Sequence, residues 1–144
     1  MQEYIDFFQQ NTLMCLAWLG IFAALIFNIF KSATAKFTFV SVNELTQLVN
    51  KENGLVIDIR SKDDFTKGHI TDSIHILASD IKAGNLSGVE SHKVDPIIVV
   101  CRAGQTAQAA ADDLVKAGFE KVNVLTNGIT AWNEANLPLV RGRK

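Results

Sequence analysis

Residues 97–111 read IIVVCRAGQTAQAAA, and this short segment contains three different patterns. Its first four residues are apolar and β-branched, which is typical of a buried strand. An alanine-rich helical pattern follows within a few residues of Cys101. The segment therefore predicts a strand over residues 97–100, a tight loop, and a helix over residues 105–117, with a thiol at the end of the strand.

A cysteine at such a junction is well placed for chemistry. Ligands of open α/β sheets bind at the carboxyl ends of the strands, and a helix N-terminus there offers free N–H groups and positive partial charge. The thiolate is the nucleophilic form of cysteine, and we expect the helix start, the backbone at Gly104 and the guanidinium of Arg102 to stabilise it. A cysteine that merely ends a core strand is the alternative, and the small-residue loop favours the chemical role.

The rest of residues 37–140 alternates between strand and helix patterns, which predicts an α/β fold with a mostly parallel sheet covered on both faces. Strands are expected at residues 37–40, 55–59, 73–77, 97–100 and 122–125. Helices are expected after the capping box of Ser41 and Glu44, and at residues 62–67, 105–117 and 128–134. Residues 80–91 read as a polar connection with at most one or two helical turns.

Three motifs in this order resemble the rhodanese-like (single-domain sulfurtransferase) family. They are VIDIR, DF and GHI within residues 56–70, CRAGQT at residues 101–106, and GF, VNVL, G and AW within residues 118–132. The resemblance covers residues 37–140. It implies a rhodanese-like domain with a mostly parallel five-stranded sheet and helices on both faces.

The resemblance also implies an activity. In that family the loop cysteine carries a persulfide that the loop amides cradle, so Cys101 is expected to be the catalytic nucleophile of a thiosulfate-type sulfurtransferase. Sulfane sulfur would pass from thiosulfate or another small donor to a thiol or cyanide acceptor, without a cofactor. The substrate-binding loop would comprise Arg102, Ala103, Gly104, Gln105 and Thr106.

Some positions depart from the family pattern. Many members have arginine at the sixth loop position, where this chain has Thr106. A hydroxyl contributes no positive charge, so we expect weak turnover of thiosulfate and a preference for another donor. Asn127 replaces the first glycine of a Gly-Gly pair, and because asparagine tolerates positive φ we expect that turn to survive.

Three further residues of the first motif are expected to support the site. Asp58 and Arg60 lie two residues apart and share a face, which favours a structural ion pair over direct contact with substrate. His69 is expected to be a hydrogen-bonded packing residue rather than an acid or base. His75 and His92 have no partners at metal-ligand spacing, so no metal site is predicted.

Three other functions fit parts of the pattern. Phosphatases of one class share the rhodanese fold, but they need an arginine at the position of Ala107 to clamp phosphate, which argues against phosphate-ester hydrolysis. A non-catalytic, membrane-tethered docking module is the second alternative, and a persulfide relay for a partner protein is the third. The presence of Cys101 places the enzyme ahead of the docking module.

The N-terminal part of the chain has a different composition. Residues 12–30 contain no charge, and as a helix they would span about 28 Å, close to the hydrocarbon thickness of a bilayer. We therefore expect one transmembrane helix. The whole chain then divides into a short flank at residues 1–11, the transmembrane helix at 12–30, a linker at 31–36, the rhodanese-like domain at 37–140 and a basic tail at 141–144.

A cleaved signal peptide is the main rival of this anchor. The flank carries Glu3 and Asp6 but no basic residue, which is atypical of a signal peptide. Lys31 and Lys36 follow the apolar run, so the positive-inside tendency predicts a single-pass protein of the inner (cytoplasmic) membrane with its C-terminal domain in the cytoplasm. Such a protein could also contact a membrane protein or a sulfur-relay partner.

Charge and cysteine usage exclude other classes. The net charge is −1, and no basic stripe is present, so nucleic acid is not an expected partner. The two cysteines, Cys15 and Cys101, lie far apart, and no disulfide framework is implied. Reduced thiol chemistry fits this pattern.

Overall fold

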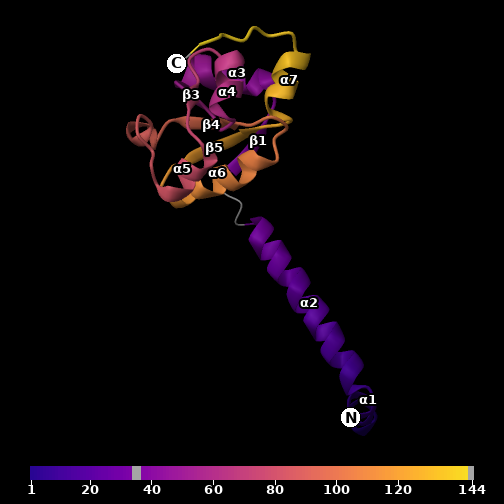
Figure 1. Cartoon of the computed structure of the whole chain (residues 1–144). Helices are drawn as coiled ribbons and strands as arrows, with labels where there is room; N and C mark the ends of the chain where they lie inside the picture. Colours follow the sequence, from indigo (N-terminus) through magenta and orange to yellow (C-terminus); the bar gives the residue numbers. More distant parts are fainter. Residues whose placement is uncertain (34–36, 143–144) are drawn as a thin grey trace. The chain divides into compact units, whose positions relative to one another are not determined.

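A computed structural model describes residues 1–33 and 37–142 of the chain. The chain divides into two compact units, Met1–Ala35 and Lys36–Lys144. Each unit is described by itself (Figure 1).

The C-terminal unit is built on five parallel strands in the order β1-β5-β4-β2-β3. The strands are β1 Phe37–Val40, β2 Leu55–Asp58, β3 Ile74–His75, β4 Pro96–Val100 and β5 Lys121–Leu125. The five-stranded parallel sheet is confirmed. β4 is the central strand, and all five of its residues are buried, as its continuous apolar run indicated.

Helices cover both faces of this sheet (Figure 1). Their bounds are α3 Val42–Glu52, α4 Lys62–Lys67, α5 Ala78–Ala83, the 3₁₀ turn η1 Glu90–His92, α6 Thr106–Lys116 and α7 Gly128–Glu134. Alternate residues of β4 point into two separate cores: Ile97 and Val99 pack with residues of α5 and α6, whereas Ile98 and Val100 pack with residues of α3 and α7. The two-layer covering places the end of β4 between the two helical layers.

The capping box at the start of α3 is confirmed. The backbone N–H of Ser41 donates to Oε2 of Glu44 at 2.7 Å, and the N–H of Glu44 donates to Oγ of Ser41 at 3.3 Å. The hydrogen bond from the Ser41 backbone holds the pKa of the Glu44 carboxyl below its usual value.

The segment that reads as a polar connection has the short helical turns allowed for it, but it also contributes to the core, which was not expected. It contains α5 and η1, and it buries Ile81, Leu86 and Val89 in the core beside α6. Glycines and charged residues interrupt its apolar spacing, so no regular period marks these core positions. The strand expected at residues 73–77 is also shorter, because only Ile74 and His75 pair with β2.

The N-terminal unit consists of α1, Gln2–Gln10, and α2, Thr12–Ala33. The predicted flank is thus largely helical, and α2 extends into the first residues of the predicted linker; residues 34–36 of that linker and 143–144 of the basic tail lie outside the described residues. Over the part of the chain that the structure describes, α1 and Thr12–Phe27, bent by 86° where they meet, satisfy the length and hydropathy of a membrane span together, and no single helix does so.

Candidate active site

β4 delivers Cys101 to the edge of the sheet where the parallel strands end. The residue is buried, with 3% of its surface exposed, and its Sγ accepts a hydrogen bond from the backbone N–H of Gly104 at 2.9 Å. We call residues 101–106 the Cys101 loop. The loop curls back on its own first residue, so a backbone donor points at the sulfur.

Gly104 makes this curl possible. Its φ is +90°, and a Cβ at this position would lie 3.0 Å from the backbone nitrogen of Asn127. Any other residue would be strained by the positive φ and by the close contact of its Cβ with Asn127. The loop then enters α6, whose first residue is Thr106 and whose N-cap position is Gln105. The side chains of Ala103, Gln105 and Thr106 are exposed.

The start of α7 supports the Cys101 loop by donating hydrogen bonds to its carbonyl groups. The N–H of Ile129 donates to the carbonyl of Cys101 at 2.8 Å, and Oγ1 of Thr130 donates to the carbonyl of Arg102 at 2.9 Å. Gly128 lies so close that a Cβ there would approach the Cys101 carbonyl oxygen to 2.1 Å. Asn127, with φ of 58°, makes the left-handed turn expected of it.

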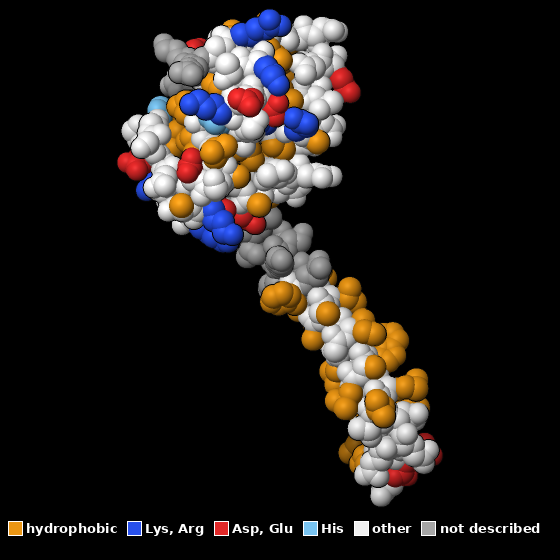
Figure 2. All heavy atoms as spheres, in the orientation of Figure 1, with side chains coloured by type: hydrophobic (Ala, Val, Ile, Leu, Met, Phe, Trp, Pro, Cys, Tyr) orange, Lys and Arg blue, Asp and Glu red, His pale blue; other side chains and the backbone are white. Residues whose placement is uncertain are grey.

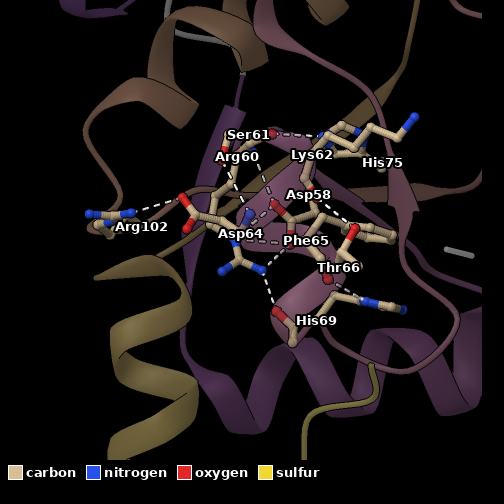
Figure 3. Close-up of polar contacts among 11 residues, drawn as sticks. Asp58, Arg60, Ser61, Lys62, Asp64, Phe65, Thr66, His69, His75 and Arg102 are labelled. Atoms are coloured by element: carbon tan, nitrogen blue, oxygen red, sulfur yellow. Dashed lines mark hydrogen bonds and ion pairs between the residues drawn. The ribbon is translucent and has the colours of Figure 1, made fainter. Parts of the chain in front are cut away.

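Arg102 pairs with a carboxylate outside the loop. Its Nη2 donates to Oδ2 of Asp64 in α4 at 2.8 Å, and the arginine side chain is 74% exposed (Figure 3). This hydrogen bond is the main reason why the pKa of the Asp64 carboxyl is lowered. From the sequence we expect the Arg102 guanidinium to stabilise the sulfur. In the structure it instead donates its hydrogen bond to Asp64.

Asp58 and Arg60 form a buried ion pair at the end of β2. Nε and Nη2 of Arg60 donate to both carboxylate oxygens of Asp58 at 2.7–3.1 Å, and Nη2 also donates to the carbonyl of Gly68 at 2.7 Å. Asp58 is 1% exposed. The pair ties β2 to the end of α4, which is the structural arrangement favoured from the sequence.

His69 is a packing residue in this structure. Its Nδ1 lies 2.8 Å from the carbonyl of Phe65, and the two rings stack with centroids 3.8 Å apart. Its backbone pairs with Val140 in an isolated antiparallel bridge. Because the Phe65 carbonyl can only accept a hydrogen bond, Nδ1 of His69 is the donor in that contact. None of these contacts involves the Cys101 loop.

The structure therefore brings together only part of the predicted site. The Cys101 loop is one continuous unit, Asp58 and Arg60 brace the neighbouring strand, and His69 belongs to another region. Sequence reasoning missed Asp64, Gly128 and Thr130 as residues that hold the loop in place. Asp64 and Gly128 did carry a signal, as parts of the first and third motifs, whereas Thr130 carried none. Among the described residues, no three His, Cys, Asp or Glu side chains gather as metal ligands.

Comparisons with known proteins identify the family to which this fold belongs. The profile of the family described as rhodanese-like domain matches residues 41–135. The uncharacterized protein YibN of Escherichia coli K12 is 44% identical over 143 residues, which cover 99% of this chain and 100% of that protein. Thiosulfate sulfurtransferase GlpE of Shewanella oneidensis is 34% identical over 102 residues, covering 71% of this chain and 98% of that enzyme.

A solved structure shows the same fold. The rhodanese-like domain of the Alr3790 protein from an Anabaena species superposes with a TM-score of 0.62 at 23% identity, covering 71% of this chain and 77% of that one.

Proposed function

The chain belongs to the rhodanese-like domain family, and from this premise we propose that it is a membrane-anchored sulfurtransferase that carries sulfane sulfur on Cys101. The Cys101 thiolate attacks the outer sulfur of a donor such as thiosulfate. The donor's S–S bond breaks, sulfite leaves with the electron pair, and a Cys101 persulfide remains. A thiol or cyanide then attacks the terminal sulfur and restores the thiolate.

The observation that carries this proposal is the hydrogen bond from Gly104 to Sγ of Cys101. A backbone donor aimed at a strand-end sulfur stabilises negative charge on it without any reorganisation of the loop. The same arrangement suits each sulfur anion that the transfer creates. The family relationship to thiosulfate sulfurtransferases supports this activity at the level of the superfamily.

The surroundings of the loop favour donors other than thiosulfate. Thr106 brings no positive charge, and Asp64 neutralises the Arg102 guanidinium that stands beside Cys101. A dianion such as thiosulfate therefore meets little net positive charge beside the Cys101 loop. We propose that donors with less negative charge near their sulfane sulfur, such as polysulfides of small thiols, are transferred faster.

We also propose that α2 is the membrane anchor, although the described part of α2 reaches the length and hydropathy of a span only together with α1. It is a continuous helix, and its large apolar side chains are exposed, including Leu13, Trp18, Phe22 and Phe27. Exposed apolar side chains around a helix match a lipid environment. With the lysine-flanked end inside, the protein would be a single-pass protein of the inner membrane, with the sulfurtransferase domain in the cytoplasm.

Mass spectrometry of the purified full chain tests the chemistry. After exposure to thiosulfate or a polysulfide and removal of the donor, we expect a mass gain of one sulfur atom that cyanide removes. The variant C101S should show no gain, whereas C15S, which lacks the other cysteine, should behave as the parent does. If no donor loads the parent protein, the domain is a docking module rather than an enzyme.

Cell fractionation tests the anchor. We expect the full chain in the membrane fraction after an alkaline wash, released only by detergent. A charge in the middle of the helix, as in L19K, costs about 3 kcal/mol of insertion free energy and should move protein to the soluble fraction. A parent protein that is soluble, or a mature N-terminus near residue 36, would contradict the anchor.

A further inference from the structure

One cavity of the C-terminal unit has no residue of the Cys101 loop in its lining. It has a volume of about 970 Å³ and lies among α4, residues 69–75 and residues 140–142. We call it the His69 pocket. Its volume is at the upper end of the range for small-molecule sites. Figure 3 shows Asp64 and Arg102 on one side of α4, and His69 and His75 on the other.

Backbone hydrogen bonds hold the wall of the His69 pocket in place. The N–H of His69 donates to the carbonyl of Val140, and the N–H of Val140 donates to the carbonyl of His69, both at 2.9 Å. The N–H of Gly142 donates to the carbonyl of Thr66 at 3.1 Å. These bonds join the C-terminal segment to α4, so the pocket is a built feature of the fold.

One buried polar group in this lining has no partner. Ser73 is 3% exposed, and among the described residues its Oγ is the buried side-chain atom that makes no hydrogen bond. A buried hydroxyl without a partner is destabilising, and native proteins keep such groups where a ligand or a water completes them. Ser73 lines the pocket, but its Oγ is closed off from solvent in this structure, so a molecule in the pocket accepts its hydrogen bond only when the lining moves by a small amount.

The charges of the lining define the class of that molecule. The lining contains two cations, Lys62 and Arg141, and one carboxylate, that of Asp72, so its charged side chains sum to one net positive charge with the histidines counted as neutral. The apolar part of the lining comes from Phe65, Ile74 and Val140. Figure 2 shows histidine and basic side chains next to hydrophobic ones on the face in view.

We propose that the His69 pocket is a second ligand site, which binds a small organic monoanion: a carboxylate or sulfonate on an apolar body. The anionic head lies between Lys62 and Arg141 and accepts a hydrogen bond from Ser73. The body lies against Phe65, Ile74 and Val140. No residue of the Cys101 loop takes part, so the site is independent of persulfide formation.

Titration of sodium benzoate into the ¹⁵N-labelled full chain in lipid nanodiscs tests the proposal. We expect saturable amide shifts confined to residues 62–75 and 140–142, with the same dissociation constant in C101S. Benzylamine, which has the same ring and the opposite charge, should produce none of these shifts. Shifts centred on residues 101–106, or equal shifts with benzylamine, would overturn the proposal.

Two variants separate binding from folding. The double variant K62Q/R141Q removes the cations, which are exposed, and should weaken benzoate binding at least tenfold. S73A should weaken it several-fold without lowering the free energy of unfolding, because the hydroxyl it removes has no partner in the protein. A dissociation constant that both variants leave unchanged would overturn the proposal.

Discussion

The Cys101 loop and the His69 pocket lie on two sides of the same short helix, α4. They differ in the atoms that form them. Backbone atoms make the loop: the Gly104 N–H faces the sulfur, and α7 holds the loop carbonyls. Side chains from segments distant in the sequence make the pocket. A backbone site leaves a short, contiguous signature in a sequence, whereas a side-chain site of this kind leaves none.

A substitution of Asp58 tests whether the Asp58–Arg60 pair supports both the Cys101 loop and the His69 pocket. Its partner Arg60 reaches Gly68 with its side chain and His75 with its carbonyl, the latter at 2.7 Å. D58A leaves a buried guanidinium without its carboxylate, so we expect the free energy of unfolding to fall by about 3–5 kcal/mol. Urea denaturation measures this loss, and both persulfide loading and benzoate binding should weaken.

The exposed pair of His92 and Asp95 gives the matched control for D58A. Its atoms lie at a similar distance, 2.9 Å, but both side chains are about a third exposed. D95A should therefore cost less than about 1 kcal/mol. Equal losses for D58A and D95A would show that the buried pair is not the common support of the two regions.

A substitution of Gly128 tests whether the Cys101 loop can be disrupted while the His69 pocket stays intact. In G128A the new Cβ overlaps the Cys101 carbonyl, and positive φ adds strain, so we expect a loss of about 2–4 kcal/mol in the free energy of unfolding. Persulfide loading should fall sharply while benzoate binding persists. G88A has a similar backbone strain in open space and should cost only about 1–2 kcal/mol, with loading intact.

Asp64 tests donor choice without altering the loop backbone. D64N frees the Arg102 guanidinium for an anionic donor, so we expect kcat/KM for thiosulfate to rise about fivefold, because an unpaired cation near the surface attracts a dianion. An uncharged trisulfide donor should show no gain. The same rise in an R102Q background would contradict the mechanism, because that background has no guanidinium to free.

The smallest effect is a dependence of stability on pH. The folded protein holds the pKa of Asp64 below its unfolded value, so the carboxylate adds stability above about pH 4 and loses that contribution as pH falls through the lowered pKa. The difference in unfolding free energy between the parent and D64N should therefore shrink from pH 6 to pH 3. A difference that grows on acidification would contradict the assignment.

Local signals predicted the parts of the fold that local chemistry determines. The hydroxyl and carboxylate of Ser41 and Glu44 identify a helix start, because they satisfy free N–H groups within one turn. The left-handed turn at Asn127 follows from its side-chain type. Cys101 and Gly104 could be recognised as a strand-end loop for the same reason, since the hydrogen bond from the Gly104 N–H to the sulfur joins residues three apart in the sequence.

Contacts between distant segments could not be predicted in this way. Arg102 of the Cys101 loop pairs with Asp64 of α4, 38 residues away in the sequence, and nothing in the two residue types indicates which carboxylate the guanidinium will meet. Val140 pairs with His69 only because the chain returns to α4 after α7. Leu86 and Val89 are core residues because α6 lies over them, although their own segment has no apolar period.

The depth of the Cys101 sulfur has a consequence for the order of events. Cys101 is 3% exposed, so under the proposed function a donor must reach its sulfur with a slender sulfur terminus. In the proposed persulfide the outer sulfur stands about 2 Å beyond Sγ. Under that proposal the donor and the acceptor meet different sulfur atoms of the same residue, so they need not obey the same steric limit.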